Sequence, residues 1–316
     1  MDNNKKLIIL TGPTAVGKTA LSLRLAKEIG GEIISADSIA VYKHFDIGSA
    51  KITKQEMQGI PHHLIDVMEP KDAFHVAQFK EYAEKAIKQI YQNNHIPIIT
   101  GGTGFYIQAV LNDIDFTEHG EDDSYRKQLE KIVLEKGNPY LHNMLNSIDP
   151  EAAKLIHENN VKRVIRALEF YHQTGTCISS HNEKESKKTS VYNSAYFVLN
   201  CNRELLYKRI ELRIDEMLER GLVDEVKSLV RDYHVAREDV SMQGLGYKEI
   251  LEYLEGMCTY EEAIYKLKRD TRHFAKRQIT WFRREPDVIW VDKDKLTTED
   301  EQLSFMLKVL KEKHIV

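Results

Sequence analysis

Residues 12–19 of this 316-residue chain form a glycine-rich segment of the kind that holds a phosphate. The segment follows the pattern G-x-x-x-x-G-K-[ST] and consists of Gly12, Pro13, Thr14, Ala15, Val16, Gly17, Lys18 and Thr19. Its glycines let backbone N–H groups curl around phosphate oxygens, and the N-terminus of a following helix adds its positive dipole end. Lys18 supplies a compact cation for a terminal phosphate, and the Thr19 hydroxyl is a ligand for Mg²⁺. The segment predicts a site for a diphosphate or a triphosphate.

The remaining polar residues leave the phosphate chemistry open. An ATPase or GTPase holds its metal with a carboxylate at the end of a neighbouring apolar strand, and both Asp37 and Asp66 follow apolar runs. A third apolar run ends instead in the sequence GGTG, where small residues allow close backbone approach to a ligand and Thr103 offers a hydroxyl. These residues alone predict a phosphate-binding enzyme and no particular reaction.

The elements that must position these motifs alternate between short β-rich runs and helical patterns, which is typical of a parallel α/β sheet. We predict strands at 7–11, 32–36, 96–100, 195–199 and 288–291, and helices at 19–29, 76–92, 204–220 and 260–282. A last helix follows the final strand. The predicted fold class is α/β, a P-loop NTPase-like parallel sheet flanked by helices.

A change in composition near residue 116 predicts an insertion into this fold. The segment 117–124 is acidic and turn-prone, the next 50 residues read as helices without strands, and the polar segment 174–190 is predicted to be a loop. We therefore expect a catalytic core of residues 1–116 plus 191–316, interrupted by a helical insertion domain at 117–190.

Charge and cysteine content exclude several classes of protein. With 45 Lys and Arg against 49 Asp and Glu, the net charge of −4 excludes binding of nucleic acid by bulk charge, so any such site must be a local patch. Three scattered cysteines predict neither a disulfide framework nor a metal site, and a reducing compartment follows. No run approaches the ~20 apolar residues of a membrane span. We expect a cytoplasmic protein with no membrane partner.

Basic residues gather in two places. Between residues 266 and 284 the chain has eight Lys or Arg residues against one acid, and Arg269, Arg272 and Lys276 recur at helical spacing. Such a stripe binds nucleic-acid phosphates or is simply a solvated helix face, and the pattern is compatible with both. A smaller cluster, made of Lys162, Arg163 and Arg166, lies in the predicted insertion.

Several motifs, taken in order, resemble one family. They are the phosphate loop, ISADSIAVY at 34–42, DIGSAK at 46–51, PHHLID at 61–66, GGTGFY at 101–106, GLGY at 244–247 and KRQITWF at 276–282. Together they resemble the bacterial tRNA dimethylallyltransferases, which prenylate the adenosine immediately 3′ of the anticodon. The resemblance covers nearly the whole chain. No cysteine follows Cys258, so the resemblance is to bacterial members, without the zinc module of eukaryotic ones.

This resemblance implies that the phosphate loop holds dimethylallyl diphosphate rather than ATP, with Mg²⁺ as cofactor. Lys18 and a metal at Thr19 would then absorb the charge of the leaving diphosphate. Asp37 would accept the proton of the adenine N6, although a metal ligand or a helix cap also fits its position. Thr103 would lie near the leaving group or the acceptor amine. Arg213 would be a further cation at the diphosphate, unless it is a solvated helix charge.

The resemblance also implies contacts with a tRNA anticodon stem-loop, whose target base must leave its stack. The implied contact residues are Asp37, Ser38, Ile39, Ala40, Thr103, Arg126, Lys162, Arg163, Arg166, Met242, Gln243, Gly244, Gly246, Tyr247, Arg269, Arg272 and Lys276. The insertion would be mobile and swing against the RNA stem, and we expect the protein to be a monomer.

Three other functions compete with this interpretation. An isopentenyltransferase acting on free adenine nucleotides would share the core, but has less need of the insertion and the basic clusters. A P-loop small-molecule kinase would place Asp66 or Asp37 on its metal and transfer the γ-phosphate of ATP. A non-catalytic, RNA-binding NTPase switch would hydrolyse nucleotide slowly and bind RNA in a nucleotide-dependent way.

Overall fold

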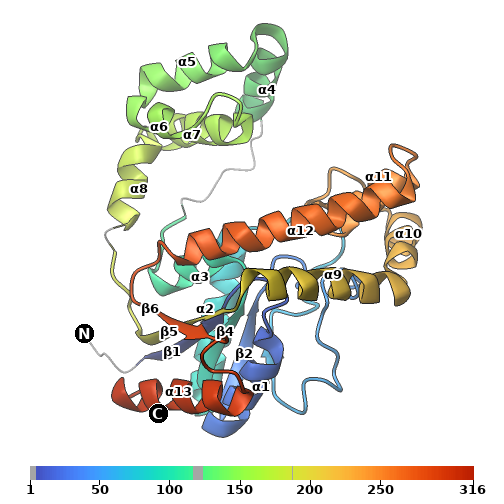
Figure 1. The fold of residues 1–316 in the computed structure, drawn as a ribbon. Coiled ribbons are helices and arrows are strands. Elements are labelled where there is room, and N and C mark those ends of the chain that lie inside the picture. The colour runs from blue at the N-terminus through green and yellow to red at the C-terminus, as the bar shows by residue number, and fades with distance from the viewer. Residues whose placement is uncertain (1–4, 117–123, 187) are drawn as a thin grey trace. The chain divides into compact units, whose positions relative to one another are not determined.

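A computed structural model describes residues 5–116, 124–186 and 188–316 (Figure 1). The chain divides into two compact units, the first formed by Met1–Leu111 with Ser190–Val316 and the second by Asn112–Thr189. Most of the acidic segment expected at 117–124 lies outside the described residues. In the part of the chain that the structure describes, no helix is both long and apolar enough to cross a membrane.

The first unit is built on a six-stranded sheet in which every pair of neighbouring strands is parallel (Figure 1). The strands lie in the order β3-β2-β4-β1-β5-β6. They are β1 (Lys6–Thr11), β2 (Gly31–Ala36), β3 (His62–His63), β4 (Ile96–Gly101), β5 (Asn193–Asn200) and β6 (Val288–Asp292). The central strands are near-continuous apolar runs because helices cover both faces of a parallel sheet. Leu7, Ile8, Ile9 and Leu10 are accordingly fully buried.

Helices surround this sheet, which confirms the predicted α/β class. They are α1 (Lys18–Ile29), α2 (Val76–Gln92), α3 (Gly104–Leu111), α9 (Arg203–Glu219), α10 (Leu222–Tyr233), α11 (Tyr247–Leu254), α12 (Tyr260–Phe282) and α13 (Glu299–Glu312), with a short 3₁₀ helix at Val240–Gln243. The longest of the described helices, α12, begins in a capping box: the Thr259 hydroxyl accepts the Glu262 N–H, and the Glu262 carboxylate accepts the Thr259 N–H. In Figure 1, α12 and α9 run side by side.

Because the strands are parallel, their carboxyl ends meet at one edge of the sheet, where open α/β folds bind their ligands. β1 leads there into the phosphate loop, β2 leads into Asp37, and β4 leads into the GGTG sequence. The pairing of β4 with both neighbours places Gly101 opposite Thr11 and Ala36. Three motifs that are far apart in the chain therefore come together at one place.

The second unit is helical in its described residues and has a small apolar core of its own. Its helices are α4 (Ser124–Lys136), α5 (Asn138–Ile148), α6 (Pro150–Leu155), α7 (Val161–Thr174) and α8 (Ile178–Ser186). The core is formed by Leu129, Leu141, Leu145, Val164 and Leu168.

The prediction of a loop over 174–190 is wrong, because α8 occupies most of that segment. The polar composition of this segment gives no helical pattern in the sequence. The helix is stabilised by a contact with Asp149, which precedes α6. The Asp149 carboxylate accepts bonds from the backbone N–H of Ser179, at 2.9 Å, and from its hydroxyl, at 2.7 Å. The same carboxylate caps α6 through the Ala152 N–H at 3.0 Å. One acidic side chain thus satisfies orphan donors at the starts of two helices.

Candidate functional site

The phosphate loop joins β1 to α1 and has the tight backbone that its glycines allow. Gly12 and Gly17 have φ angles of +147° and +95°, which favour glycine. A Cβ at Gly12 would also lie 2.6 Å from the Leu199 carbonyl oxygen. Since α1 begins at Lys18, its N–H groups and the positive end of its dipole lie at the loop. The Lys18 Nζ donates to the Gly12 and Pro13 carbonyls at 3.0 and 2.9 Å, and its third N–H remains for a ligand.

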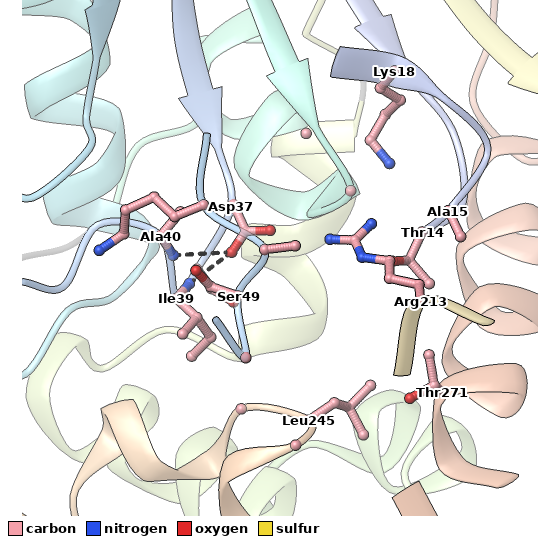
Figure 2. A pocket seen from close by; sticks show the side chains of 18 of the residues that line it. Thr14, Ala15, Lys18, Asp37, Ile39, Ala40, Ser49, Arg213, Leu245 and Thr271 are labelled. Atoms are coloured by element: carbon pink, nitrogen blue, oxygen red, sulfur yellow. Dashed lines mark hydrogen bonds between the residues drawn. The ribbon is translucent and has the colours of Figure 1, made fainter. Parts of the chain in front are cut away.

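Two partly buried cations, Lys18 and Arg213, and the Asp37 carboxylate converge beside this loop (Figure 2). Burial and, to a smaller extent, the neighbouring Arg213 guanidinium together lower the pKa of Lys18 to about 7, although the Asp37 carboxylate opposes this shift. Burial also lowers the pKa of Arg213, and Asp37 and Glu216 oppose that shift. Buried, mutually repelling positive charges are stabilised when an anion enters between them. Arg213 therefore lies in the site and is not a solvated charge on the surface of α9.

Asp37 follows β2 directly, and its carboxylate shapes the next turn. Its Oδ1 accepts the backbone N–H groups of Ile39 and Ala40 at 2.8 and 3.1 Å, drawn as dashed lines in Figure 2. Asp66, the other candidate from the sequence, binds the Lys51 Nζ at 2.6 Å and does not line the cavity. Of the two, only Asp37 is placed to meet a ligand at the phosphate loop.

The GGTG sequence forms the third side of the site. A Cβ on Gly101 would collide with the backbone of Ala36, so β4 and β2 approach each other closely here. The Thr103 N–H donates to the Ala36 carbonyl at 3.3 Å, which brings Thr103 to the cavity wall.

A cavity of about 680 Å³ lies among these segments. Its lining in the described residues includes six basic side chains, Lys18, Lys51, Arg209, Arg213, Lys248 and Arg277. Of the acidic residues that the structure describes, only Asp37 and Glu216 contribute carboxylates to it. Apolar side chains form another part of the wall, among them Ile39, Ile210, Met217, Leu245 and Phe274. A ligand that carries both a multiply charged anion and an apolar group fits this lining.

The residues expected to contact RNA around residues 37–40 and 242–247 do not all reach the cavity. Ser38, Ile39, Ala40, Gln243, Gly244 and Gly246 line it. Met242 and Tyr247 are fully buried in this structure, and the RNA contacts expected of them stay a prediction. The Tyr247 hydroxyl instead donates to Glu225 at 2.8 Å and accepts the Ser49 N–H at 3.1 Å. Both side chains belong to the apolar core of the first unit.

The basic stripe on α12 splits into a paired half and an exposed half. Arg269 binds the adjacent Asp270 at 2.8 Å, and Arg272 binds Glu211 on α9 at 2.7 Å. Lys276 and Arg277, further along, are exposed. They line a second groove with His273, Thr280, Trp281 and Arg284. The positive surface offered to an anion therefore lies toward the C-terminal end of the stripe.

In the second unit, the predicted cluster also divides. Lys162 and Arg163 are exposed at the start of α7. Arg126 makes a bidentate pair with Glu169, through Nε at 2.8 Å and Nη2 at 2.7 Å. Burial lowers the pKa of Arg166. Arg126 is exposed as well, but its guanidinium is paired with Glu169, so Lys162 and Arg163 are the better placed to meet an RNA backbone.

Sequence reasoning missed some of the residues that line the cavity. Arg209 lies one helical turn before Arg213, and this i, i+4 spacing was a signal that could have identified it. Leu245 and Phe274 left no comparable signal, because apolar residues of this kind are usually core. Gln278 lies within the KRQITWF motif, which by itself indicates no role for this side chain.

The fold and the cavity define a phosphate-loop α/β protein whose site accepts an anionic ligand with an apolar part. Residues 40–285 match the family model described as IPP transferase. A tRNA dimethylallyltransferase of Lachnoclostridium phytofermentans is 57% identical over 310 residues, which is 98% of this chain and 99% of that protein. Another, of Carboxydothermus hydrogenoformans, is 51% identical over 94% of each.

Solved structures agree with these sequence relatives. The full-length tRNA isopentenylpyrophosphate transferase of Bacillus halodurans has a TM-score of 0.72 at 44% identity and covers 98% of both chains. A eukaryotic dimethylallyltransferase described as acting on tRNA has a TM-score of 0.83 at 33% identity, over 98% of this chain and 79% of that one. The chain belongs to the IPP transferase family, as the resemblance in its motifs predicted.

Proposed function

We propose that this protein transfers a dimethylallyl group from dimethylallyl diphosphate to N6 of the adenosine immediately 3′ of the anticodon in tRNA, releasing diphosphate. One observation carries the proposal. A single cavity combines the cations of a phosphate loop, an apolar wall and the carboxylate of Asp37, which is near enough to Lys18 to raise its pKa. These are the groups that a prenyl diphosphate and an amine acceptor require. The names of the relatives support the same reaction.

In this reaction the bond between the prenyl carbon and the diphosphate oxygen breaks while a bond from N6 to that carbon forms. The departing diphosphate carries off the electron pair, and Lys18 and Arg213 stabilise its growing charge. The N6 amine loses a proton as it becomes bonded to carbon, and Asp37 accepts that proton. Thr103, on the neighbouring wall, orients the leaving group or the acceptor amine through its hydroxyl.

The donor set fits Mg²⁺ bound mainly through the substrate. The Thr19 hydroxyl lies at the head of α1, and the described residues contain no cluster of three His, Cys, Asp or Glu side chains able to hold a metal. Mg²⁺ is commonly held by few protein groups together with substrate phosphates and water. Thr19 would be its protein ligand, and the ion would supply further neutralisation of the diphosphate charge.

The acceptor adenine must leave its stack to reach a buried diphosphate. We place the base at the part of the cavity wall that is formed by Gln243, Gly244 and Gly246 and by the turn of residues 38–40. The exposed Lys276 and Arg277 would bind RNA phosphates nearby on the first unit. Lys162 and Arg163 would bind the stem from a mobile insertion. We place the enzyme in the cytoplasm, as a monomer.

A transfer assay with unmodified tRNA and Mg²⁺ tests the proposal. Labelled dimethylallyl diphosphate and γ-labelled ATP are supplied in parallel reactions, and free AMP serves as a second acceptor. We expect prenyl label in tRNA and not in AMP, at the adenosine 3′ of the anticodon after digestion. Label in AMP would indicate a nucleotide isopentenyltransferase. Phosphate released from ATP without prenyl transfer would indicate a kinase or an NTPase.

A further inference from the structure

Gln278 on α12 has a buried amide that joins two loops of the proposed diphosphate site. Its side chain is 6% exposed. The Gln278 Oε1 accepts the Thr14 N–H of the phosphate loop at 2.9 Å. The Gln278 Nε2 donates to the Gly102 carbonyl of the GGTG sequence at 2.9 Å. One amide group thus bridges segments that follow β1 and β4.

The backbone around this bridge is built to admit α12. A Cβ on Gly102 would collide with the Gln278 Nε2, and a Cβ on Gly104 would collide with the indole of Trp281. Gln278 and Trp281 are three residues apart and therefore lie on the same face of the helix. The missing side chains at Gly102 and Gly104 let α12 approach, and the Gln278 amide then connects it to the phosphate loop.

An amide is the group that this position requires. It accepts one bond and donates another, whereas a carboxylate only accepts and an apolar side chain does neither. Both partners of Gln278 are backbone groups, so its role does not depend on the identity of the neighbouring side chains. Loss of the bridge would leave a partly buried donor at Thr14 and a partly buried acceptor at Gly102 without this partner.

We propose that Gln278 is a positioning residue, which sets the distance between the phosphate loop and the Thr103 wall and so holds diphosphate and acceptor in reacting geometry. This inference rests on the diphosphate site of the proposed function. Gln278 also lines the cavity, and in this proposal it acts through its two hydrogen bonds to the backbone at Thr14 and Gly102. Small displacements of bound groups have large effects on rate.

The first test compares Gln278→Met with a matched control, Gln302→Met. Gln302 is also a buried glutamine, 1% exposed, but it lies on α13 and donates to the Leu296 carbonyl at 2.8 Å, outside the cavity lining. Binding of inorganic diphosphate with Mg²⁺ is measured by calorimetry, and kcat, the KM for each substrate and Tm are measured beside it.

We expect Gln278→Met to weaken diphosphate binding about tenfold and to lower kcat by about tenfold to a hundredfold, with the KM for tRNA unchanged. Gln302→Met should lower Tm and leave diphosphate binding and kcat unchanged. If Gln278→Met loses Tm but binds diphosphate and turns over like the wild type, the inference is wrong. If the wild-type protein does not bind diphosphate at all, both the proposed function and this inference are wrong.

A second variant, Gln278→Glu, keeps the side-chain shape and supplies an independent readout. The introduced carboxyl still accepts the Thr14 N–H, but it donates to the Gly102 carbonyl only when protonated. Burial raises the pKa of a carboxyl group, so its protonated form is accessible at mildly acidic pH. The ratio of wild-type to variant kcat/KM should therefore shrink as the pH falls from about 8 to about 5.5. A ratio that does not change with pH would overturn the inference.

Discussion

Replacing Asp37 by Asn separates the chemical role of this carboxylate from its structural role. In the structure, the Asp37 Oδ1 accepts two backbone N–H groups, at 2.8 and 3.1 Å. The amide oxygen of an asparagine accepts the same two bonds, so the turn at Ile39 and Ala40 is retained. What is lost is the negative charge and the capacity to accept a proton from the adenine N6.

A positioned general base contributes about 10²- to 10⁴-fold in rate, which corresponds to about 3–5 kcal/mol of transition-state stabilisation. We expect kcat for Asp37→Asn to fall by that factor. The binding of dimethylallyl diphosphate should persist or tighten, because a negative charge beside Lys18 and Arg213 is removed. Asp37→Ala should show the same kinetic loss and, in addition, about 2 kcal/mol of lost stability, since two hydrogen bonds of about 1 kcal/mol each disappear.

Single-turnover prenyl transfer at saturating substrate, read together with urea unfolding, measures both quantities. Asp72→Asn is the matched control, because its carboxylate accepts the Glu69 N–H at 2.9 Å in a turn away from the cavity. That control should retain wild-type turnover. Turnover of Asp37→Asn within a few-fold of the wild type would refute the base assignment. Loss of diphosphate binding in the same variant would indicate a metal-binding role instead.

Other perturbations test the cations, the close approach of α12 and the basic groove. Burial lowers the pKa of Lys18 to about 7. Since a diphosphate binds the protonated amine and raises its pKa again, affinity should fall up to about tenfold per pH unit above 7. Calorimetry of the wild type against Lys18→Met measures this, and parallel pH slopes in the two proteins would contradict it. Gly102→Ala should displace the Gln278 amide and lower kcat about tenfold or more, with tRNA binding measured by filter retention unchanged. An Ala triple variant of Lys276, Arg277 and Arg284 should weaken tRNA binding and reduce the slope of log K against log salt by about 2–3. An unchanged slope would mean that the groove is only a solvated face.

Local patterns in the sequence were sufficient to predict the class of fold and the phosphate loop. Alternating apolar runs and helical periods predicted the parallel sheet, because strand and helix periods are properties of neighbouring residues. The phosphate loop was identified in the same way, since its glycines, Lys18 and Thr19 act within one turn of chain. Positions after apolar runs made Asp37, Asp66 and Thr103 candidates, because a parallel sheet collects its ligand-binding residues there, and the family resemblance favoured Asp37 and Thr103.

What the sequence alone could not decide were the contacts between distant segments. The partners of Gln278 lie 264 and 176 positions earlier in the chain. Arg272 is paired with an acid 61 positions away. The α8 segment is capped from Asp149, 30 positions earlier, and reads as a polar loop without it. A hydrogen bond or an ion pair depends on distance in space, and strand order and helix packing set that distance. Only the tertiary structure therefore decided which basic residues stay exposed, which expected contact residues are buried and which amide joins the two loops of the site.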